Sequence, residues 1–168
     1  MAYQDHVRAS DSIRVRCAII TLSDTRTPET DKSGQQIRAL LEAAGHAIVR
    51  YELIPDDLNA LHALLTEILS QHDVDVVLTN GGTGVGRRDT TIEVVESHLD
   101  QTLPGFGELF RMLSWHEIGS GAMLSRAVGG ISRGKLLFAM PGSTGAVELA
   151  MTKLILPELK HLVHELRK

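Results

Sequence analysis

The chain has 168 residues, which allows one domain with a substantial core and excludes two full-sized ones. Seventeen Lys and Arg residues against 21 Asp and Glu residues give a formal charge of −4, and Trp, Tyr and Phe are scarce. This balance argues against a nucleic-acid-binding protein, because such proteins usually carry a basic excess and aromatic residues for base stacking.

Cysteine usage and hydropathy bear on the compartment. The single Cys17 cannot form an internal disulfide and lies in an apolar run, so we interpret it as a small core residue in a reducing compartment. Residues 1–12 form a polar tail without the apolar region of a signal peptide, and no apolar stretch reaches the roughly 18 to 20 residues that cross a bilayer. We therefore expect a cytoplasmic protein with no membrane partner and a single domain over residues 13–168.

Four β-rich apolar runs, each followed by turn residues, predict strands. The third run shows no alternation, which is typical of a parallel strand that is covered on both faces. The predicted strands cover residues 15–22, 47–54, 74–78 and 135–140.

Apolar residues at helical spacing predict helices between these strands, and residues of N-cap type precede three of them. The helical patterns lie at residues 37–44, 58–68, 92–99, 106–118 and 146–166, where Pro157 either kinks the last helix or begins a new turn. Residues 119–134, rich in Gly and Ser, stay unassigned. The cap candidates are Asp31 or Ser33, Asp56 or Asp57, and the pair Thr90 and Glu93, which has capping-box spacing.

The alternation of strands and helices predicts an α/β fold, a three-layer αβα arrangement with a mainly parallel sheet and right-handed crossovers. In such sheets ligands bind outside the carboxyl ends of the strands. Thirteen of the fifteen glycines lie between Gly81 and Gly145, so the second half of the chain is expected to carry the unusual backbone.

The strongest motif is the glycine loop between the third strand and the next helix, T-N-G-G-T-G-V-G-R-R-D at residues 79–89. Consecutive glycines let backbone N–H groups point into one concavity, and the helix N-terminus adds partial positive charge, so the loop can hold a phosphate. It is neither a Walker A loop nor a dinucleotide fingerprint. A plain tight turn is the alternative, but four glycines within six residues favour a ligand loop.

Acidic residues accompany this loop. Asp89 either favours the helix dipole or, because a carboxylate beside a phosphate needs a cation between them, helps to hold Mg²⁺. Of Asp56 and Asp57, one is expected to cap a helix and the other to face the same edge as Asp89. Arg87 and Arg88 are either phosphate contacts or solvated loop charges.

The remaining candidates are weaker taken singly. Ser23 and Asp24 end the first strand at the same rim, although an Asx-type turn explains them almost as well. Glu108 and Arg111 form either a surface ion pair or ligand contacts. Other hydroxyl-bearing and basic elements of the glycine-rich half are Ser125-Arg126 and Pro141-Gly142-Ser143.

Taken together, seven motifs in order resemble the MoaB/Mog family of molybdenum-cofactor biosynthesis proteins, from about residue 15 to the C-terminus. The Pro141-Gly142-Ser143-Thr144 turn is similar to that of the MoaB branch. The motifs are S-D-T at 23–25, D-K-S-G at 31–34, L-I-P-D at 53–56, the glycine loop, P-G-F-G-E-L-F-R at 104–111, S-R-A-V-G-G at 125–130 and M-P-G-S-T at 140–144.

The resemblance implies a compact α/β domain that binds molybdopterin and assembles as a trimer or a hexamer. It implies adenylylation of molybdopterin by Mg-ATP, after which a partner protein inserts molybdate. Asp56 and Asp89 match two important aspartates of the family and are the candidate catalytic residues and Mg²⁺ ligands. The candidate nucleotide- and pterin-binding residues are Ser23, Asp24, Gly81, Gly82, Thr83, Gly84, Glu108, Ser125, Arg126, Pro141, Gly142 and Ser143.

Two alternatives remain open. A non-catalytic oligomeric pterin-binding protein of the same pathway is the second hypothesis, because some members of the MoaB branch bind pterin without efficient adenylylation. A nicotinamide oxidoreductase is a distant third, since the dinucleotide fingerprint fails and the chain has no Tyr-x-x-x-Lys pair.

Overall fold

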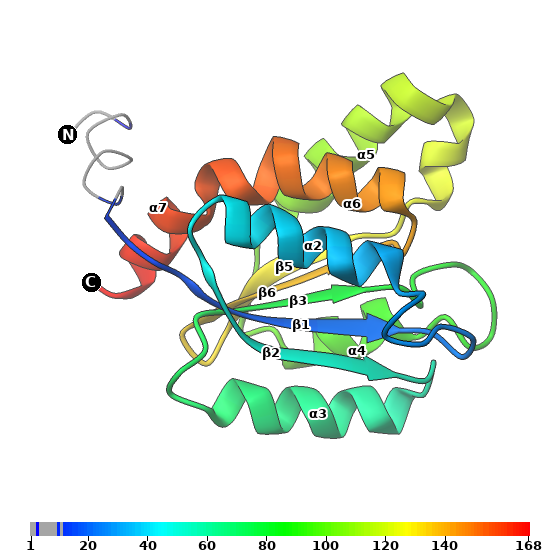
Figure 1. Ribbon diagram of the computed structural model, residues 1–168. Coiled ribbons are helices and arrows are strands. Elements are labelled where there is room, and N and C mark those ends of the chain that lie inside the picture. Colours follow the sequence, from blue (N-terminus) through cyan, green and yellow to red (C-terminus); the bar gives the residue numbers. More distant parts are fainter. Residues whose placement is uncertain (1–2, 4–9, 11) are drawn as a thin grey trace.

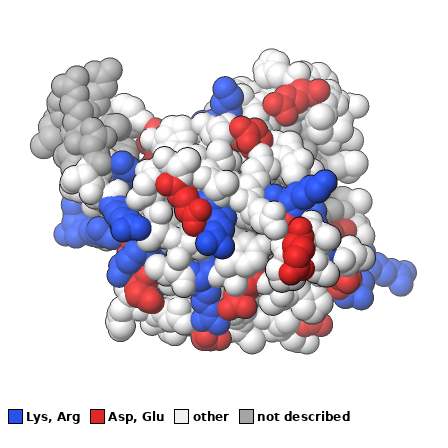
Figure 2. Space-filling view, viewed as in Figure 1, with Lys and Arg blue, Asp and Glu red and all other residues white. Residues whose placement is uncertain are grey.

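The computed structural model describes residues 3, 10 and 12–168, so most of the predicted tail, residues 1–12, lies outside the described residues. A six-stranded sheet lies between two layers of helices, as the sequence predicts (Figure 1). In the part of the chain that is described, no helix is both long and apolar enough to span a bilayer. Acidic and basic side chains are interspersed over the face shown in Figure 2.

The sheet has the order β2-β1-β3-β6-β5-β4. Its first four strands are parallel to one another, whereas β5 pairs antiparallel with β6 on one side and with β4, the edge strand, on the other. The strands are β1 (Arg16–Leu22), β2 (Ala47–Ile54), β3 (Val76–Asn80), β4 (Gln101–Thr102), β5 (Val128–Ser132) and β6 (Lys135–Met140).

Apolar side chains alternate between the two faces of the sheet and create two cores. Cys17 and Ile19 of β1 lie in the core under α2, α5, α6 and α7, while Ala18 and Ile20 lie in the core under α3 and α4 (Figure 1). The helices are α2 (Lys32–Ala43), α3 (Leu58–Ser70), α4 (Thr91–His98), α5 (Pro104–Ile118), α6 (Thr144–Ala150) and α7 (Leu156–Leu166), with a 3₁₀ segment, η1 (Gly119–Leu124), and a π segment, η2 (Met151–Ile155).

The structure shows which of the candidate residues cap α2 and α3. Asp31 caps α2 by accepting from the Gly34 N–H at 3.1 Å, and Asp57 caps α3 by accepting from the Ala60 N–H at 2.7 Å. Asp56 is therefore not the cap of α3. Pro157 stands in the first turn of α7, after the π segment, so it begins a new turn.

The predicted capping box at the start of α4 is wrong. Thr90 occupies the N-cap position, but its side chain makes no capping hydrogen bond. The carboxylate of Glu93 instead pairs with Arg126, at 2.5 Å. The charged guanidinium of Arg126 is a stronger donor to the Glu93 carboxylate than the backbone N–H of Thr90, which a capping box would use.

The position of the third strand differs from the prediction, and the region left unassigned contains regular structure. The third strand lies two residues later than predicted, because Thr79 and Asn80 continue the ladder opposite Ala139 and Met140 of β6. The unassigned glycine-rich region contains the 3₁₀ segment and β5, whose two central glycines pack closely on aromatic and backbone atoms. The two-residue β4 carries no sequence signal of its own.

At the amino edge of the sheet, Asp75 joins three parts of the chain. Its carboxylate accepts from the backbone N–H and the guanidinium of Arg16 and from the guanidinium of Arg167 at 2.9 Å. Arg167 follows α7, so this cluster fastens the C-terminal helix to β1 and β3.

Candidate functional site

The carboxyl ends of the four parallel strands meet at the opposite edge, which brings the predicted motifs together. The Asp56 segment follows β2, Ser23 and Asp24 follow β1, the glycine loop follows β3 and the Pro141 turn follows β6. The antiparallel direction of β5 explains why Ser125 and Arg126, which come just before that strand, arrive at the same edge.

Glycine is required where the glycine loop passes between its neighbours. Gly81 has φ +96°, and a Cβ there would lie 2.3 Å from the carbonyl oxygen of Leu22. The Gly81 N–H donates to the carbonyl of Met140 at 3.1 Å. The loop is thus held directly against the ends of β1 and β6.

The concave part of the loop keeps backbone donors available. The N–H groups of Gly82, Thr83 and Gly84 donate to no group among the residues that the structure describes. They precede the N-terminus of α4, and this arrangement favours an anionic group.

Asp89 closes the loop. Its Oδ2 accepts from the Gly86 N–H at 2.9 Å, and its own N–H donates back to the Gly86 carbonyl at 3.0 Å. A Cβ at Gly84 would lie 2.7 Å from Oδ2 of Asp89, so the carboxylate lies directly against the glycine backbone. This contact leaves no room for a side chain at position 84.

Asp56 and Asp24 come together beside the loop. Oδ1 of Asp24 accepts from the Asp56 N–H at 3.1 Å and from the guanidinium of Arg88 at 3.1 Å, and Arg88 also donates to the Asp56 carbonyl at 2.9 Å. Arg88 therefore binds protein carboxylate and carbonyl groups. A separate depression of about 380 Å³ on this side is lined by Asp56, Asp57, Leu58, Arg87, Arg88 and Thr90.

The electrostatics at Asp56 favour a cation. Burial raises the pKa of the Asp56 carboxyl, and the negative charges of Asp24 and Asp89 raise it further. Its Oδ1 is buried and accepts no hydrogen bond from a described residue, and the same holds for the buried Oγ1 of Thr91. Both oxygens flank Gly82, at 3.0 and 2.3 Å from the position that a Cβ would occupy there.

These features fit Mg²⁺ that shares its ligands with phosphate oxygens, because one or two carboxylates then suffice. A self-contained protein site is not present among the described residues, in which no three His, Cys, Asp or Glu side chains are placed to hold a metal ion. Asp56 and Asp89 are the residues that would hold the ion.

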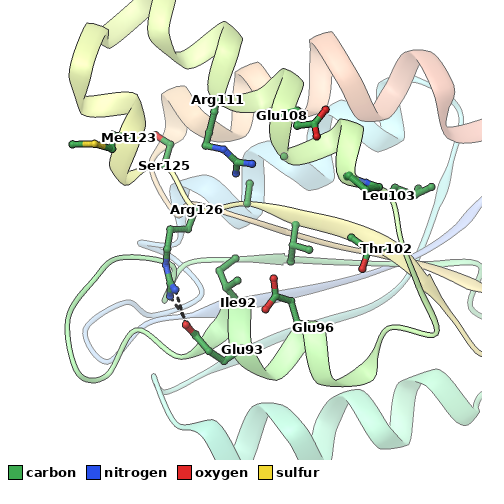
Figure 3. Close-up of a pocket in the computed structure, with 14 residues that line it drawn as sticks. Ile92, Glu93, Glu96, Thr102, Leu103, Glu108, Arg111, Met123, Ser125 and Arg126 are labelled. Atoms are coloured by element: carbon green, nitrogen blue, oxygen red, sulfur yellow. Dashed lines mark hydrogen bonds and ion pairs between the residues drawn. The ribbon is translucent and has the colours of Figure 1, made fainter.

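A cavity of about 480 Å³ has α4 on one side and α5 on the other (Figure 3), and Arg126 in its wall donates to the Thr83 carbonyl of the glycine loop. Glu108 and Arg111 project from α5, and Glu93 and Glu96 project from α4. Ser125 and Arg126 are also in its wall, so three predicted site residues, Glu108, Ser125 and Arg126, share this cavity.

Ser125 connects this cavity with a smaller one. A cavity of about 160 Å³ is lined by Ser125 together with Pro141 and Ser143 of the turn after β6. The Ser143 hydroxyl accepts from the Ala146 N–H at 3.2 Å and thereby caps α6. The Ser23 hydroxyl likewise accepts from the N–H groups of Thr25 and Arg26, so both serines stabilise local turns.

A buried polar network beneath the carboxyl ends of the strands was not predicted from the sequence. Arg26 donates to the Gly142 carbonyl at 2.8 Å and to the fully buried carboxylate of Asp31 at 3.3 Å. Ser33 donates to Oδ1 of Asn80 at 2.7 Å, and Tyr51 donates to Asp31. The only local signal is the D-K-S-G motif, because the partners come from distant parts of the chain.

Comparison with known proteins agrees with this geometry. Residues 18–161 match the family described as "Probable molybdopterin binding domain". The chain belongs to this family of molybdenum-cofactor biosynthesis proteins.

Individual relatives cover nearly the whole chain. Molybdenum cofactor biosynthesis protein B of Bacillus cereus is 54% identical over 169 residues, covering 100% of this chain and 99% of the relative. A crystal structure of a molybdenum cofactor biosynthesis protein B is 57% identical, with a TM-score of 0.90 and coverage of 92% and 97%. The structure of the tungsten cofactor synthesizing protein MoaB from Pyrococcus furiosus is 37% identical, with a TM-score of 0.81 and coverage of 92% and 98%.

Proposed function

We propose that this protein is a cytoplasmic molybdopterin adenylyltransferase. The terminal phosphate of molybdopterin attacks the α-phosphorus of ATP, the bond from that phosphorus to the bridging oxygen breaks, and adenylyl-molybdopterin and pyrophosphate form. The observation that carries the proposal is the meeting of the glycine loop with Asp56 and Asp89 at the carboxyl edge of the sheet.

The residues supply positioning and charge neutralisation, which are what a phosphoryl-type transfer chiefly needs. The N–H groups of Gly82, Thr83 and Gly84 bind phosphate oxygens, and Asp56 and Asp89 hold the metal ion beside them. When bound, Mg²⁺ supplies positive charge that stabilises the transferring phosphate. No side chain needs to act as a covalent nucleophile.

The neighbouring cavity has room for part of a substrate outside the loop. Its volume of about 480 Å³ lies within the range of roughly 300 to 1,000 Å³ typical of small-molecule sites. Ser125 and Glu108 offer hydroxyl and carboxylate groups there, whereas most donors of Arg126 already bind protein atoms.

The direct test is an adenylylation assay with purified protein, molybdopterin and Mg-ATP. We expect adenylyl-molybdopterin and pyrophosphate from the wild type and neither from Asp56→Asn or Asp89→Asn. Asp57→Asn is a matched control, since Asn caps a helix as well as Asp does and Asp57 faces its own helix. Absence of product under conditions in which an active homologue forms it would refute the proposal.

The second candidate is a non-catalytic pterin-binding protein of the same pathway, favoured by the match to proteins named molybdenum cofactor biosynthesis protein B. In that case molybdopterin binds with similar affinity with and without ATP, and Asp89→Asn leaves pterin binding intact. Titration of molybdopterin into the wild type and into Asp89→Asn, each with and without ATP, separates the two candidates.

We also propose that the chain assembles as a homo-oligomer, a trimer or a hexamer, and hands its product to a molybdate-inserting partner protein. The observation in favour is a set of exposed apolar side chains on α5 and η1, among them Trp115 at 58% and Met123 at 81% exposure. Sedimentation analysis of the wild type and of Trp115→Lys tests the assembly, and a monomeric wild type would contradict it.

A further inference from the structure

Glu93 has no role in the proposed chemistry, yet its carboxylate is joined to the glycine loop through a single side chain. We propose that Glu93 is a positioning residue that fixes the glycine loop by holding Arg126 in place. The catalytic consequence rests on the proposed function, whereas the effect on the loop can be measured without it.

Arg126 joins the glycine-rich part of the loop to its C-terminal end. Its Nε donates to the Thr83 carbonyl at 3.0 Å, and Nη2 donates to the Asp89 carbonyl at 3.1 Å. Thr83 lies in the glycine-rich part and Asp89 at the end, so one rigid guanidinium fixes the distance between them. The two carbonyls are not otherwise hydrogen-bonded to another described residue.

Four of the five N–H donors of the guanidinium are used in this way. Besides the two carbonyls, Nη1 donates to Oε1 of Glu93 at 2.5 Å and Nη2 to Oε2 at 3.2 Å. Because a guanidinium has five donors and is always charged, Arg126 has little capacity left for a phosphate. This geometry gives Arg126 a structural role at the loop.

Glu93 supplies the negative charge that keeps the guanidinium at this position. The carbonyls of Thr83 and Asp89 accept hydrogen bonds but cannot neutralise a positive charge. Glu96 lines the same cavity one helical turn further along α4, and its carboxylate forms no hydrogen bond or ion pair with a described residue (Figure 3). Without Glu93, Arg126 can turn toward Glu96 and leave the loop.

Few other contacts restrain the middle of the loop. The Gly82 carbonyl accepts from the Thr91 N–H, and Gly86 and Asp89 bond to each other. Val85 at the tip is 75% exposed. Arg88 ties its own part of the loop to Asp24 and to the Asp56 carbonyl. The bonds from Arg126 are the tertiary restraint on the Thr83 and Asp89 carbonyls, and the loop conformation at these two residues depends on them.

Hydrogen exchange of backbone amides tests the proposal on the full chain. In Glu93→Ala we expect the hydrogen-bonded amides of the loop and its end, those of Gly86, Asp89 and Thr91, to exchange about tenfold faster, since each charge-assisted bond contributes on that order, with α2 and α7 unchanged. Glu93→Gln is expected to lie between, because its amide can still accept one bond. Glu96→Ala is the matched control and should leave the loop at the wild-type rate.

A variant at Arg126 tests the other side chain of the ion pair. Arg126→Lys retains the charge but cannot reach two carbonyls and a carboxylate at once, so it should accelerate exchange in the same segment. Loop exchange at the wild-type rate in Glu93→Ala and Arg126→Lys would overturn the proposal, as would equal acceleration in Glu96→Ala or acceleration spread evenly over the whole chain.

The adenylylation assay then separates this proposal from the proposed function. If the wild type is active, Glu93→Ala should lower kcat about tenfold or more with a smaller change in the KM for molybdopterin, because a misplaced loop affects the transferring phosphate. If the wild type is inactive, the proposed function fails, and the exchange rates still decide whether Glu93 holds the loop.

Discussion

Gly142 lies directly against Gly81: a Cβ at Gly142 would be 3.1 Å from the Cα atom of Gly81. The turn after β6 and the glycine loop after β3 are therefore in contact through two residues without side chains. Arg26 fixes the same turn from below through the Gly142 carbonyl. Small changes at this contact should be transmitted to the loop.

Replacing Gly81 with alanine should destabilise the protein. The backbone conformation of Gly81, with φ +96°, is unfavourable for alanine, and the new Cβ would collide with the Leu22 carbonyl at the end of β1. We expect the free energy of unfolding to fall by about 2 kcal/mol or more, measured by urea denaturation.

Gly145→Ala is the control for this change. Gly145 lies in α6 with open space at its Cβ position and no positive φ, so alanine there should stabilise the protein by up to about 1 kcal/mol. Equal effects of the two substitutions would contradict the close packing described around Gly81.

Asp56→Asn should increase stability while it removes metal binding. Because burial and then the charges of Asp24 and Asp89 raise the pKa of Asp56, its ionised form destabilises the fold. Below the pKa of the unfolded chain Asp56 is neutral in both states. The destabilisation begins as the pH rises past that value and is complete above the folded-state pKa. The variant should therefore be more stable than the wild type near about pH 7 and equally stable near about pH 3.

Thermal unfolding with and without Mg²⁺ and ATP completes this test. Ligand binding should raise the unfolding midpoint of the wild type and of Asp57→Asn, but not that of Asp56→Asn. A similar rise in Asp56→Asn would show that Asp56 is not a metal ligand.

Arg26→Met should expose the cost of the buried carboxylate of Asp31. Burial alone raises the pKa of Asp31, but hydrogen bonds from Tyr51, Thr21 and the Gly34 N–H and the charge of Arg26 lower it overall. Its contribution to stability is therefore present above the unfolded-state pKa and lost as the pH falls toward the folded-state pKa. Removing Arg26 should cost about 2 to 3 kcal/mol at neutral pH and less in acid.

A double variant provides the check on this reasoning. In Arg26→Met with Asp31→Asn the buried charge is gone, so part of the lost stability should return. If the double variant is no more stable than Arg26→Met, the charge of Asp31 is not the source of the effect.

Asp75→Asn should weaken the attachment of the C-terminal helix. Burial by itself raises the pKa of Asp75, but the hydrogen bonds from Arg16 and Arg167 hold it well below its usual range. The resulting stabilisation is present at neutral pH and is lost as the pH falls below the unfolded-state value. We expect Asp75→Asn to lower the free energy of unfolding by about 2 kcal/mol near neutral pH and by less in acid. Urea denaturation of the wild type and the variant at both pH values measures this difference.

The parallel core was predictable because each of its strands is an apolar run followed by turn residues, as Ala47–Ile54 and Lys135–Met140 illustrate. The antiparallel side of the sheet, β5 and β4, was not predictable from the sequence. The strand β4 has two exposed residues, and two of the first three residues of β5 are glycines. Register and direction there come from pairing with β6, which local sequence does not encode.

The candidate site was likewise predictable from the sequence only in part. Asp56 and Asp89 could be placed together because both follow ends of parallel strands, and Asp57 was a recognisable cap. The spacing of Thr90 and Glu93 pointed to a capping box, but the partner that Glu93 binds is 33 residues away. Long-range side-chain pairs of this kind require the folded structure.

The buried cysteine has a practical consequence. Cys17 is fully buried in β1, and burial, followed by the charge of Asp75, raises the pKa of its thiol to about 12. Since only the thiolate reacts readily, alkylating reagents should modify the chain only when it unfolds. A spectroscopic label attached to a new surface cysteine therefore needs no cysteine-free background, and the rate of Cys17 alkylation itself reports global opening.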